Sequence, residues 1–282
     1  MKNKILISTA ILLILIGAVG MAAYKFKFQE DFIDHKQAWD LKADEIKKLS
    51  IKSTFDINIS FTPGSNKEGY IQFHGKVHPE IVDRLKNLDI KGPDLTLDLT
   101  VPSRHEFFSF NFEFPKGAIE VALPQGTELE YLDVSAYSGD INLFGVSSNN
   151  INISSMSGDV TANHLTANNL NLETYSGDIE GEDLTGNLQI LSRSGDVELK
   201  QVKGEGNIEN YSGDITITQE GVSSITTLAR SGDIDITADP GFNGFYEANS
   251  RSGSVSIPPS PKESKHTIKA EAYSGNIDIR LP

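Results

Sequence analysis

Apolar and polar residues follow two different patterns along this chain. Residues 5–23 form one uninterrupted, uncharged and mainly apolar run. From residue 46 onward, apolar and polar residues alternate, and a period of two is typical of β-strands with one buried face. We therefore predict an all-β protein that is preceded by one helix.

A short motif, Ser-Gly-Asp followed by isoleucine or valine, recurs through the second half of the chain. Its eight serines are 19, 19, 18, 18, 19, 21 and 22 residues apart, and so steady a period indicates a repeat architecture. The last two copies are degenerate, with Ser254 and Asn276 in place of the aspartate. The six complete copies contain the turn residues Gly139 and Asp140, Gly158 and Asp159, Gly177 and Asp178, Gly195 and Asp196, Gly213 and Asp214, and Gly232 and Asp233.

The neighbours of the motif predict how each repeat folds. The residue two places before each serine is small, and the residue three places after it is β-branched, which suits a buried position in a sheet. This pattern predicts a parallel β-solenoid (β-helix) over residues 131–282. Each coil should contain a strand, a tight Ser-Gly turn, a second strand and a looser return, most simply as three short strands. Eight coils at about 4.8 Å would form a rod roughly 40 Å long.

Residues 46–130 alternate in the same way but show no internal repeat. Their strands are longer and richer in phenylalanine, and His78-Pro79 opens a short helix that should run to about Leu88. Because the open end of a solenoid exposes strand edges, we expect this β-rich region to be an N-terminal cap.

The apolar run at residues 5–23 predicts a membrane segment. As a helix it would be roughly 28 Å long, close to the thickness of a bilayer core. Lysines precede it, and aromatic residues and lysines follow it up to residue 28. Residues 1–28 therefore fit an uncleaved signal anchor better than a cleaved signal peptide, which has a shorter apolar region. Residues 29–45, which include Trp39, are expected to be a juxtamembrane linker or a short helix.

These features predict a single-pass protein of the cell membrane. The short N-terminal tail should be cytoplasmic and the C-terminal domain extracytoplasmic. The 282 residues carry a net charge of −14, which argues against nucleic acid as a partner, although an acidic surface also simply keeps repeat proteins soluble. The expected partners are the cytoplasmic membrane, through the N-terminal helix, and envelope proteins or a cell-wall polymer.

The residue types that carry catalysis or bind metals are scattered or absent. The chain has no cysteine, which excludes disulfides and thiolate metal sites, and its six histidines show no ligand spacing. No nucleophile or phosphate-loop motif occurs. We therefore expect no cofactor, no metal and no enzymatic activity. A polysaccharide-cleaving enzyme, the remaining enzymatic alternative, would need paired carboxylates at a break in the repeat.

Two outward-facing columns of the repeat have candidate chemistry. The aspartates could bind calcium through their oxygens, or they could accept hydrogen bonds from turn amides. The residues before the serines are tyrosine or arginine, with Met156 as the one exception, and neighbours should form cation–π pairs. This second column is either a stabilising ladder or a stripe that binds a glycan or an anionic wall polymer. The candidate stripe consists of Tyr137, Tyr175, Arg193, Tyr211, Arg230, Arg251 and Tyr273.

The order of these features resembles a known bacterial family. An N-terminal anchor, the segment Val121-Ala122-Leu123-Pro124-Gln125-Gly126 and the repeated [Tyr/Arg]-Ser-Gly-Asp-[Ile/Val] are similar to the putative-adhesin family, a former domain of unknown function that includes the LiaG-like envelope proteins. The resemblance covers roughly residue 49 to the C-terminus. It implies a right-handed β-solenoid outside the cytoplasmic membrane, a link to envelope stress, and no catalytic residues.

Pattern and resemblance together predict a non-enzymatic interaction or scaffold module at the cell envelope. The alternative is an adhesin-like protein that binds wall polymer through the outward stripe.

Overall fold

The computed structural model describes residues 14, 15, 17, 32–42, 46–62, 68–90, 92–101 and 115–282. The described residues from 32 onward belong to one compact unit, Phe32–Pro102 with Pro115–Pro282. The predicted anchor at residues 5–23 lies outside the described residues except for Ile14, Leu15 and Gly17. Within the described ranges, no helix is both long enough and apolar enough to span a bilayer.

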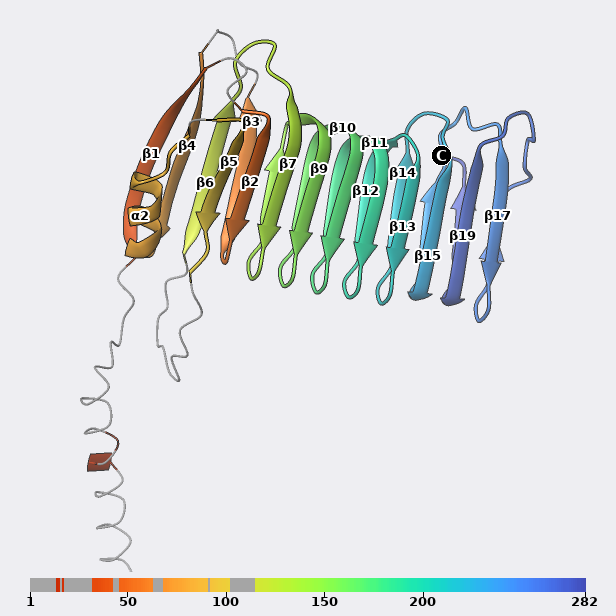
Figure 1. Cartoon of the computed structure of the whole chain (residues 1–282). Coiled ribbons are helices and arrows are strands. Elements are labelled where there is room, and N and C mark those ends of the chain that lie inside the picture. The colour runs from red at the N-terminus through yellow and green to blue at the C-terminus, as the bar shows by residue number, and fades with distance from the viewer. Residues whose placement is uncertain are drawn as a thin grey trace, which may run out of the picture. The chain divides into compact units, whose positions relative to one another are not determined.

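The compact unit is all-β apart from one short helix, as the alternating pattern predicts (Figure 1). Its strands are connected by hydrogen bonds into one continuous sheet that folds back on itself at every coil. The elements are β1 (Ile33–Lys42), β2 (Lys48–Ser53), β3 (Asp56–Thr62), β4 (Glu68–Val77), α2 (Pro79–Lys86), β5 (Asp94–Leu99), β6 (Lys116–Ala122), β7 (Leu129–Ala136), β8 (Ile141–Phe144), β9 (Ser147–Ser155), β10 (Val160–Thr174), β11 (Ile179–Ser192), β12 (Val197–Lys203), β13 (Gly206–Asn210), β14 (Ile215–Gln219), β15 (Ile225–Ser231), β16 (Ile234–Thr237), β17 (Phe245–Ser250), β18 (Val255–Ser256), β19 (Thr267–Ser274) and β20 (Ile277–Arg280).

The central coils stack in parallel and in register. β10 pairs with β11 through three stretches, which contain the pairs Val160↔Ile179, Leu165↔Leu184 and Leu172↔Ile190. The side chains of these six residues are at most 2% exposed, so each column of aliphatic residues continues from coil to coil through one narrow core. A solenoid core of this kind derives its stability from contacts between neighbouring coils.

Each Ser-Gly turn requires its glycine for two separate reasons. Gly177 has a φ of +142°, which an L-residue with a side chain rarely adopts. A Cβ atom at Gly177 would also overlap the carbonyl oxygen of Gly158 in the preceding coil. The glycines therefore allow successive corners to lie directly on top of one another.

The N-terminal part of the unit stacks out of chain order. β2 pairs in parallel with β5 on one side and with β7 on the other, and β3 pairs in the same way with β6 and β8. Residues 46–62 thus form a coil between two segments that follow them in sequence. The region expected to be a non-repeating cap is therefore partly solenoid, and its first corner contains Asp56 instead of a Ser-Gly-Asp motif.

The end of the stack is covered by β4 and β1. β4 pairs antiparallel with β6, and β1 pairs antiparallel with β4. β1 lies in the stretch expected to be a linker or short helix, where Trp39 and Leu41 are buried. The predicted helix is present as α2, beside β1 and β5, with the Nδ1 of His78 accepting a hydrogen bond from the Glu80 amide.

The last two coils are also stacked out of chain order, an arrangement that we call the exchange. β19 pairs with β15 on one side and with β17 on the other, while β20 pairs with β16 and β18. The last coil in sequence is therefore the second-last in space. The longer serine spacings of 21 and 22 residues supply the loops that this exchange needs. Val255 and Ile257 are 43% and 41% exposed because their coil is the outermost one.

A proline-rich loop lies against the outer edge of β17. The hydroxyl of Ser260, between Pro259 and Pro261, accepts a hydrogen bond of 2.8 Å from the Tyr246 amide. Prolines cannot donate backbone hydrogen bonds, so this loop does not extend the sheet further.

Three neighbouring coils bury a hydroxyl group two places before the motif serine. The oxygens of Ser155, Thr174 and Ser192 have no hydrogen-bond partner among the described residues. Replacing Thr174 by valine should therefore leave stability unchanged or raise it by up to about 1 kcal/mol, measured by urea unfolding.

The equivalent residue Asn210 provides the contrast for this prediction. Its Nδ2 donates to the carbonyl oxygen of Gly195 at 2.9 Å, so Asn210→Val should destabilise the protein. Equal losses in Thr174→Val and Asn210→Val would mean that the Thr174 hydroxyl does have a partner.

Candidate functional site

The residue before each motif serine lies in one outward row along the solenoid, which we call the Tyr/Arg row. In chain order Arg230 and Arg251 are consecutive members, so the alternation of tyrosine and arginine is broken. The exchange of the last two coils restores it. In space the row reads Tyr137, Met156, Tyr175, Arg193, Tyr211, Arg230, Tyr273, Arg251.

The guanidinium groups of the row lie over the tyrosine rings. The Cζ atom of Arg193 is 5.5 Å from the ring centre of Tyr175 and 5.6 Å from that of Tyr211. Arg230 is 4.3 Å from Tyr211 and 5.9 Å from Tyr273, and Arg251 is 4.1 Å from Tyr273. Each such exposed contact contributes on the order of 0.5–1 kcal/mol.

A second column compensates the charge of the row. Glutamates stand two places before Tyr175, Tyr211 and Tyr273, whereas leucines stand two places before Arg193 and Arg230. The residues of this column are in register, so each of these two arginines has glutamates diagonally beside it. Arg230 Nη2 lies 3.5 Å from Glu209 Oε1. From Arg193 to Arg251, the charges of the row are therefore largely balanced by neighbouring side chains.

The other end of the row is different. Of its members Tyr137, Met156 and Tyr175, the row places an arginine, Arg193, next to Tyr175 alone, and on one side only. Their exposed fractions are 66%, 51% and 60%. They line a hollow of about 390 Å³, together with the hydroxyl-bearing Ser135 and Ser154. The charged residues that line this hollow are Lys52, Glu173 and Arg193. We call it the aromatic hollow.

The aspartates of the motif form a hydrogen-bonded ladder. The Oδ1 of each aspartate accepts a hydrogen bond from the backbone amide of the aspartate in the next coil, at 2.7–2.9 Å between Asp140 and Asp233. Sequence reasoning predicted turn amides as the donors. The structure assigns these amides to the neighbouring coil, so the ladder connects coils to one another.

The ladder extends beyond the motif at both ends. Asp56 accepts from the Asp140 amide at 3.1 Å, and no Ser-Gly signal marked this residue in the sequence. At the other end, Asn276 accepts from the Ser254 amide at 2.9 Å. Ser254 lies in the outermost coil and needs no acceptor for a further one, which explains why the motif degenerates there.

Hydrogen bonding gives the aspartates of the ladder a structural role. One oxygen of each carboxylate is already bound to an amide, and nowhere in the described ranges do three or more acidic or histidine side chains gather as a possible metal site. We expect Asp196→Ala to lose about 1–2 kcal/mol of unfolding free energy, because the Asp214 amide loses a charged acceptor.

The conservative variant separates hydrogen bonding from charge at this position. Asp196→Asn keeps an acceptor oxygen, as Asn276 does naturally, and should be nearly neutral. Added calcium should leave the melting temperature unchanged in the parent, in Asp196→Ala and in Asp196→Asn. A calcium-dependent rise that Asp196→Asn abolishes would contradict this account.

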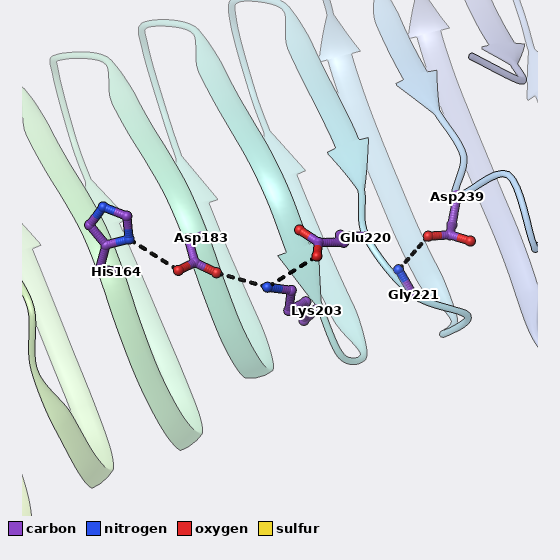
Figure 2. Close-up of polar contacts among 6 residues, drawn as sticks. All are labelled: His164, Asp183, Lys203, Glu220, Gly221 and Asp239. Carbon is purple, nitrogen blue, oxygen red and sulfur yellow. Dashed lines mark hydrogen bonds and ion pairs between the residues drawn. The ribbon is translucent and has the colours of Figure 1, made fainter.

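A second side-chain network joins His164, Asp183, Lys203 and Glu220 from successive coils, and sequence reasoning missed it (Figure 2). His164 Nδ1 is 3.0 Å from Asp183 Oδ2, and Lys203 Nζ is 3.0 Å from Asp183 Oδ1 and 3.3 Å from Glu220 Oε1. His164 and Asp183 have φ angles of +55° and +53°, so they form a corner without glycine. In the sequence, only the equivalent positions of His164 and Asp183 in consecutive coils could have indicated that these two side chains meet.

The network lowers the pKa of Asp183. The hydrogen bond from His164 has the largest effect, followed by that from Lys203. An aspartate whose pKa is lower in the folded state adds stability above its unfolded pKa, and this stability is lost as the pH falls through the folded value. Asp183→Asn should therefore cost up to about 1 kcal/mol at pH 7, as exposed pairs do.

The difference between Asp183→Asn and the parent should disappear as the pH falls below the ordinary aspartate value of 3.8. Urea unfolding at pH 7 and at acid pH measures both quantities. A difference that stays constant across this range would show that the charge of Asp183 does not contribute.

A parallel stack of coils with Ser-Gly corners and a capped N-terminal end defines the class of protein to which this chain belongs. Residues 46–282 match the family model described as Toastrack DUF4097. The chain is a member of the Toastrack DUF4097 family, and the predicted family resemblance is confirmed. A search of curated proteins found no match.

Solved structures from the genera Parabacteroides, Bacteroides and Clostridium are similar to this chain. A "putative lipid binding protein" from Parabacteroides distasonis ATCC 8503 is 16% identical, with a TM-score of 0.50, and the match covers 88% of this chain and 97% of that one. A "putative adhesin" from Bacteroides fragilis NCTC 9343 is 18% identical over the same shares, with a TM-score of 0.47. At such identity, the first of these likenesses indicates a common fold.

Proposed function

We propose that this protein is a non-enzymatic interaction module of the cell envelope that binds cell-wall glycan through the aromatic hollow. The observation that carries the proposal is the exposed group of Tyr137, Met156 and Tyr175 beside serine hydroxyls. Aromatic rings pack against the apolar faces of sugars, while hydroxyl and charged groups hydrogen-bond to sugar hydroxyls. A volume of about 390 Å³ lies within the usual range of ligand sites.

The charge pattern favours a glycan over an anionic wall polymer. Lys52 and Arg193 line the hollow together with Glu173, but the aspartate ladder follows the whole row on its other side. These carboxylates oppose the accumulation of a polyanion along the row. A neutral or weakly charged sugar chain avoids this repulsion.

The make-up of the hollow also supports binding without cleavage. Glycosidases use two carboxyl groups, roughly 5–10 Å apart, on either side of the scissile bond. Glu173 is the one carboxylate among the described residues that line the aromatic hollow. We therefore expect no release of oligosaccharides from peptidoglycan incubated with the protein.

We also propose that residues 5–23 anchor the protein in the cytoplasmic membrane, with the solenoid outside. The motivation is the uncharged run and its flanking lysines and aromatic residues. A role in the response to envelope stress follows from the family resemblance and is part of the same proposal. Protease treatment of intact cells should degrade residues 50–282, and their full protection would contradict the placement outside.

A matched pair of variants tests the binding proposal. Tyr137→Ser with Tyr175→Ser removes the exposed rings of the hollow and should lower binding of the full-length protein to purified peptidoglycan at least tenfold. Tyr211→Ser with Tyr273→Ser removes two rings of the same row that are covered by arginines. This control should destabilise the fold slightly and leave binding intact. Equal binding by both double variants would overturn the proposal.

A further inference from the structure

A larger hollow lies on the opposite side of the coil from the Tyr/Arg row. Its floor contains Ser147, Thr166 and Thr185, which are in register and stand nine places after their motif serines, about half a coil away. The turn between β6 and β7, residues 123–128, forms one wall. The volume is about 580 Å³. We call it the hydroxyl hollow.

The lining of the hydroxyl hollow combines apolar surface with uncharged polar groups. Beside the three hydroxyl residues, Asn168 Nδ2 donates to Asn149 Oδ1 at 3.3 Å, which leaves each carboxamide with further hydrogen-bonding groups. The Oγ1 of Thr127, in the wall, is buried without a partner among the described residues. A hydrogen bond of 3.0 Å from the Thr127 amide to the Pro124 carbonyl fixes this turn.

One wall of the hydroxyl hollow is apolar. Phe61, Leu123 and Pro124 contribute to it. A ligand that fits must therefore present both hydrogen-bonding groups and C–H groups. Sugars have this character, because their hydroxyls project from a ring whose faces are apolar.

The charges at the hydroxyl hollow exclude an anionic ligand. No cation belongs to its described lining, and Glu128 is its one charged residue. The hydroxyl column continues from Thr185 to Lys203 in the next coil, but the Lys203 ammonium is held by Asp183 and Glu220 (Figure 2). Among the residues that the structure describes, an anion would thus meet no free positive charge. A purely apolar ligand would leave the hydroxyls and carboxamides unpaired, at a cost for each group.

We infer that the hydroxyl hollow binds an uncharged sugar unit of a glycan. This site is separate from the aromatic hollow and does not depend on the function proposed for it. With one site on each side of the coil, a single molecule can contact two glycan strands, and simultaneous contact increases overall affinity without any new interaction.

The inference is tested by titrating the full-length protein with uncharged oligosaccharides of N-acetylglucosamine and of glucose. We expect saturable binding of at least one of them by calorimetry. Thr166→Val with Thr185→Val should weaken this binding at least tenfold, because two hydroxyls are replaced by methyl groups of similar size. Thr166→Trp, which fills the hollow, should abolish the part of the binding that takes place there.

The control is Thr216→Val with Thr218→Val, which changes two exposed threonines of β14, away from both hollows. It should bind as the parent does, and Tyr137→Ser with Tyr175→Ser should keep the part of the binding that Thr166→Trp removes. Failure of both oligosaccharides to bind, or unchanged binding by Thr166→Trp, would overturn the inference. Loss of binding in the tyrosine variant alone would place the sugar in the aromatic hollow instead.

Discussion

A cysteine pair at Thr226 and Lys269 is expected to form a disulfide in the folded protein, whereas a pair at Thr226 and Glu247 is not. Thr226 and Lys269 are register partners in β15 and β19, and Glu247 pairs with Lys269 from the other side. Adjacent strands lie about 4.8 Å apart, so Thr226 and Glu247 should be separated by about 10 Å, beyond the reach of a disulfide.

This experiment distinguishes the exchanged order from simple stacking along the chain. In a solenoid without exchange, the coil of Glu247 would follow directly on that of Thr226, and the two results would be reversed. The chain contains no cysteine that could interfere. The pair Glu247→Cys with Lys269→Cys is the positive control, because its members are neighbours in both arrangements. Mild oxidation followed by non-reducing gel electrophoresis and peptide mapping gives the answer.

Gly195→Ala is expected to cause the largest loss of stability among single substitutions at the corners, about 3–5 kcal/mol. The φ of Gly195 is +122°, and an added Cβ would overlap the carbonyl oxygen of Gly177 in the coil below. A corner that rises to avoid this contact must also break the hydrogen bond of 2.7 Å between the Asp196 amide and Asp178 Oδ1.

Gly221→Ala separates the two causes of this loss. Gly221 also has a positive φ, of +84°, but a Cβ there would meet no atom within 4 Å. Its substitution should cost only the backbone strain, about 1–2 kcal/mol. Urea unfolding of both variants measures the difference. Equal losses would mean that close stacking of the corners contributes nothing beyond backbone conformation.

The repeat itself could be predicted from the sequence because each coil is specified locally. Each corner has a glycine, a small residue before it and a β-branched residue after it, as at Gly177 and Ile179. These residues leave the chain one consistent way to turn back and bury its apolar side chains. The outward position of the tyrosines and arginines followed from the same alternation.

The order of the coils could not be predicted, because the repeats are interchangeable. Ile225 could pack against a large apolar side chain in either coil, Ile268 or Tyr246, so hydrophobic pattern alone does not select the partner. The coil at residues 46–62 lacks the Ser-Gly signal and was therefore assigned to the cap. Only the stacking in space reveals that Asp56 begins the aspartate ladder.

The division of the Tyr/Arg row into two parts also required the structure. Seven residues looked equivalent in sequence, yet Tyr211 and Tyr273 each have two arginines over their rings, whereas Tyr175 has one and remains 60% exposed. The hydroxyl hollow could not be predicted from the sequence, because Ser147, Thr166 and Thr185 meet the turn at residues 123–128 only in the folded chain.

The most direct test of glycan binding uses the methyl group of Met156 as a reporter. The chain has three methionines, and Met156 lies in the aromatic hollow between Tyr137 and Tyr175. In full-length protein labelled with ¹³C at its methionine methyl groups, the signal that Met156→Leu removes should shift saturably when soluble peptidoglycan glycan fragments are added. A Met156 signal that does not move, while the fragments still bind, would contradict the proposal that the aromatic hollow is the glycan site.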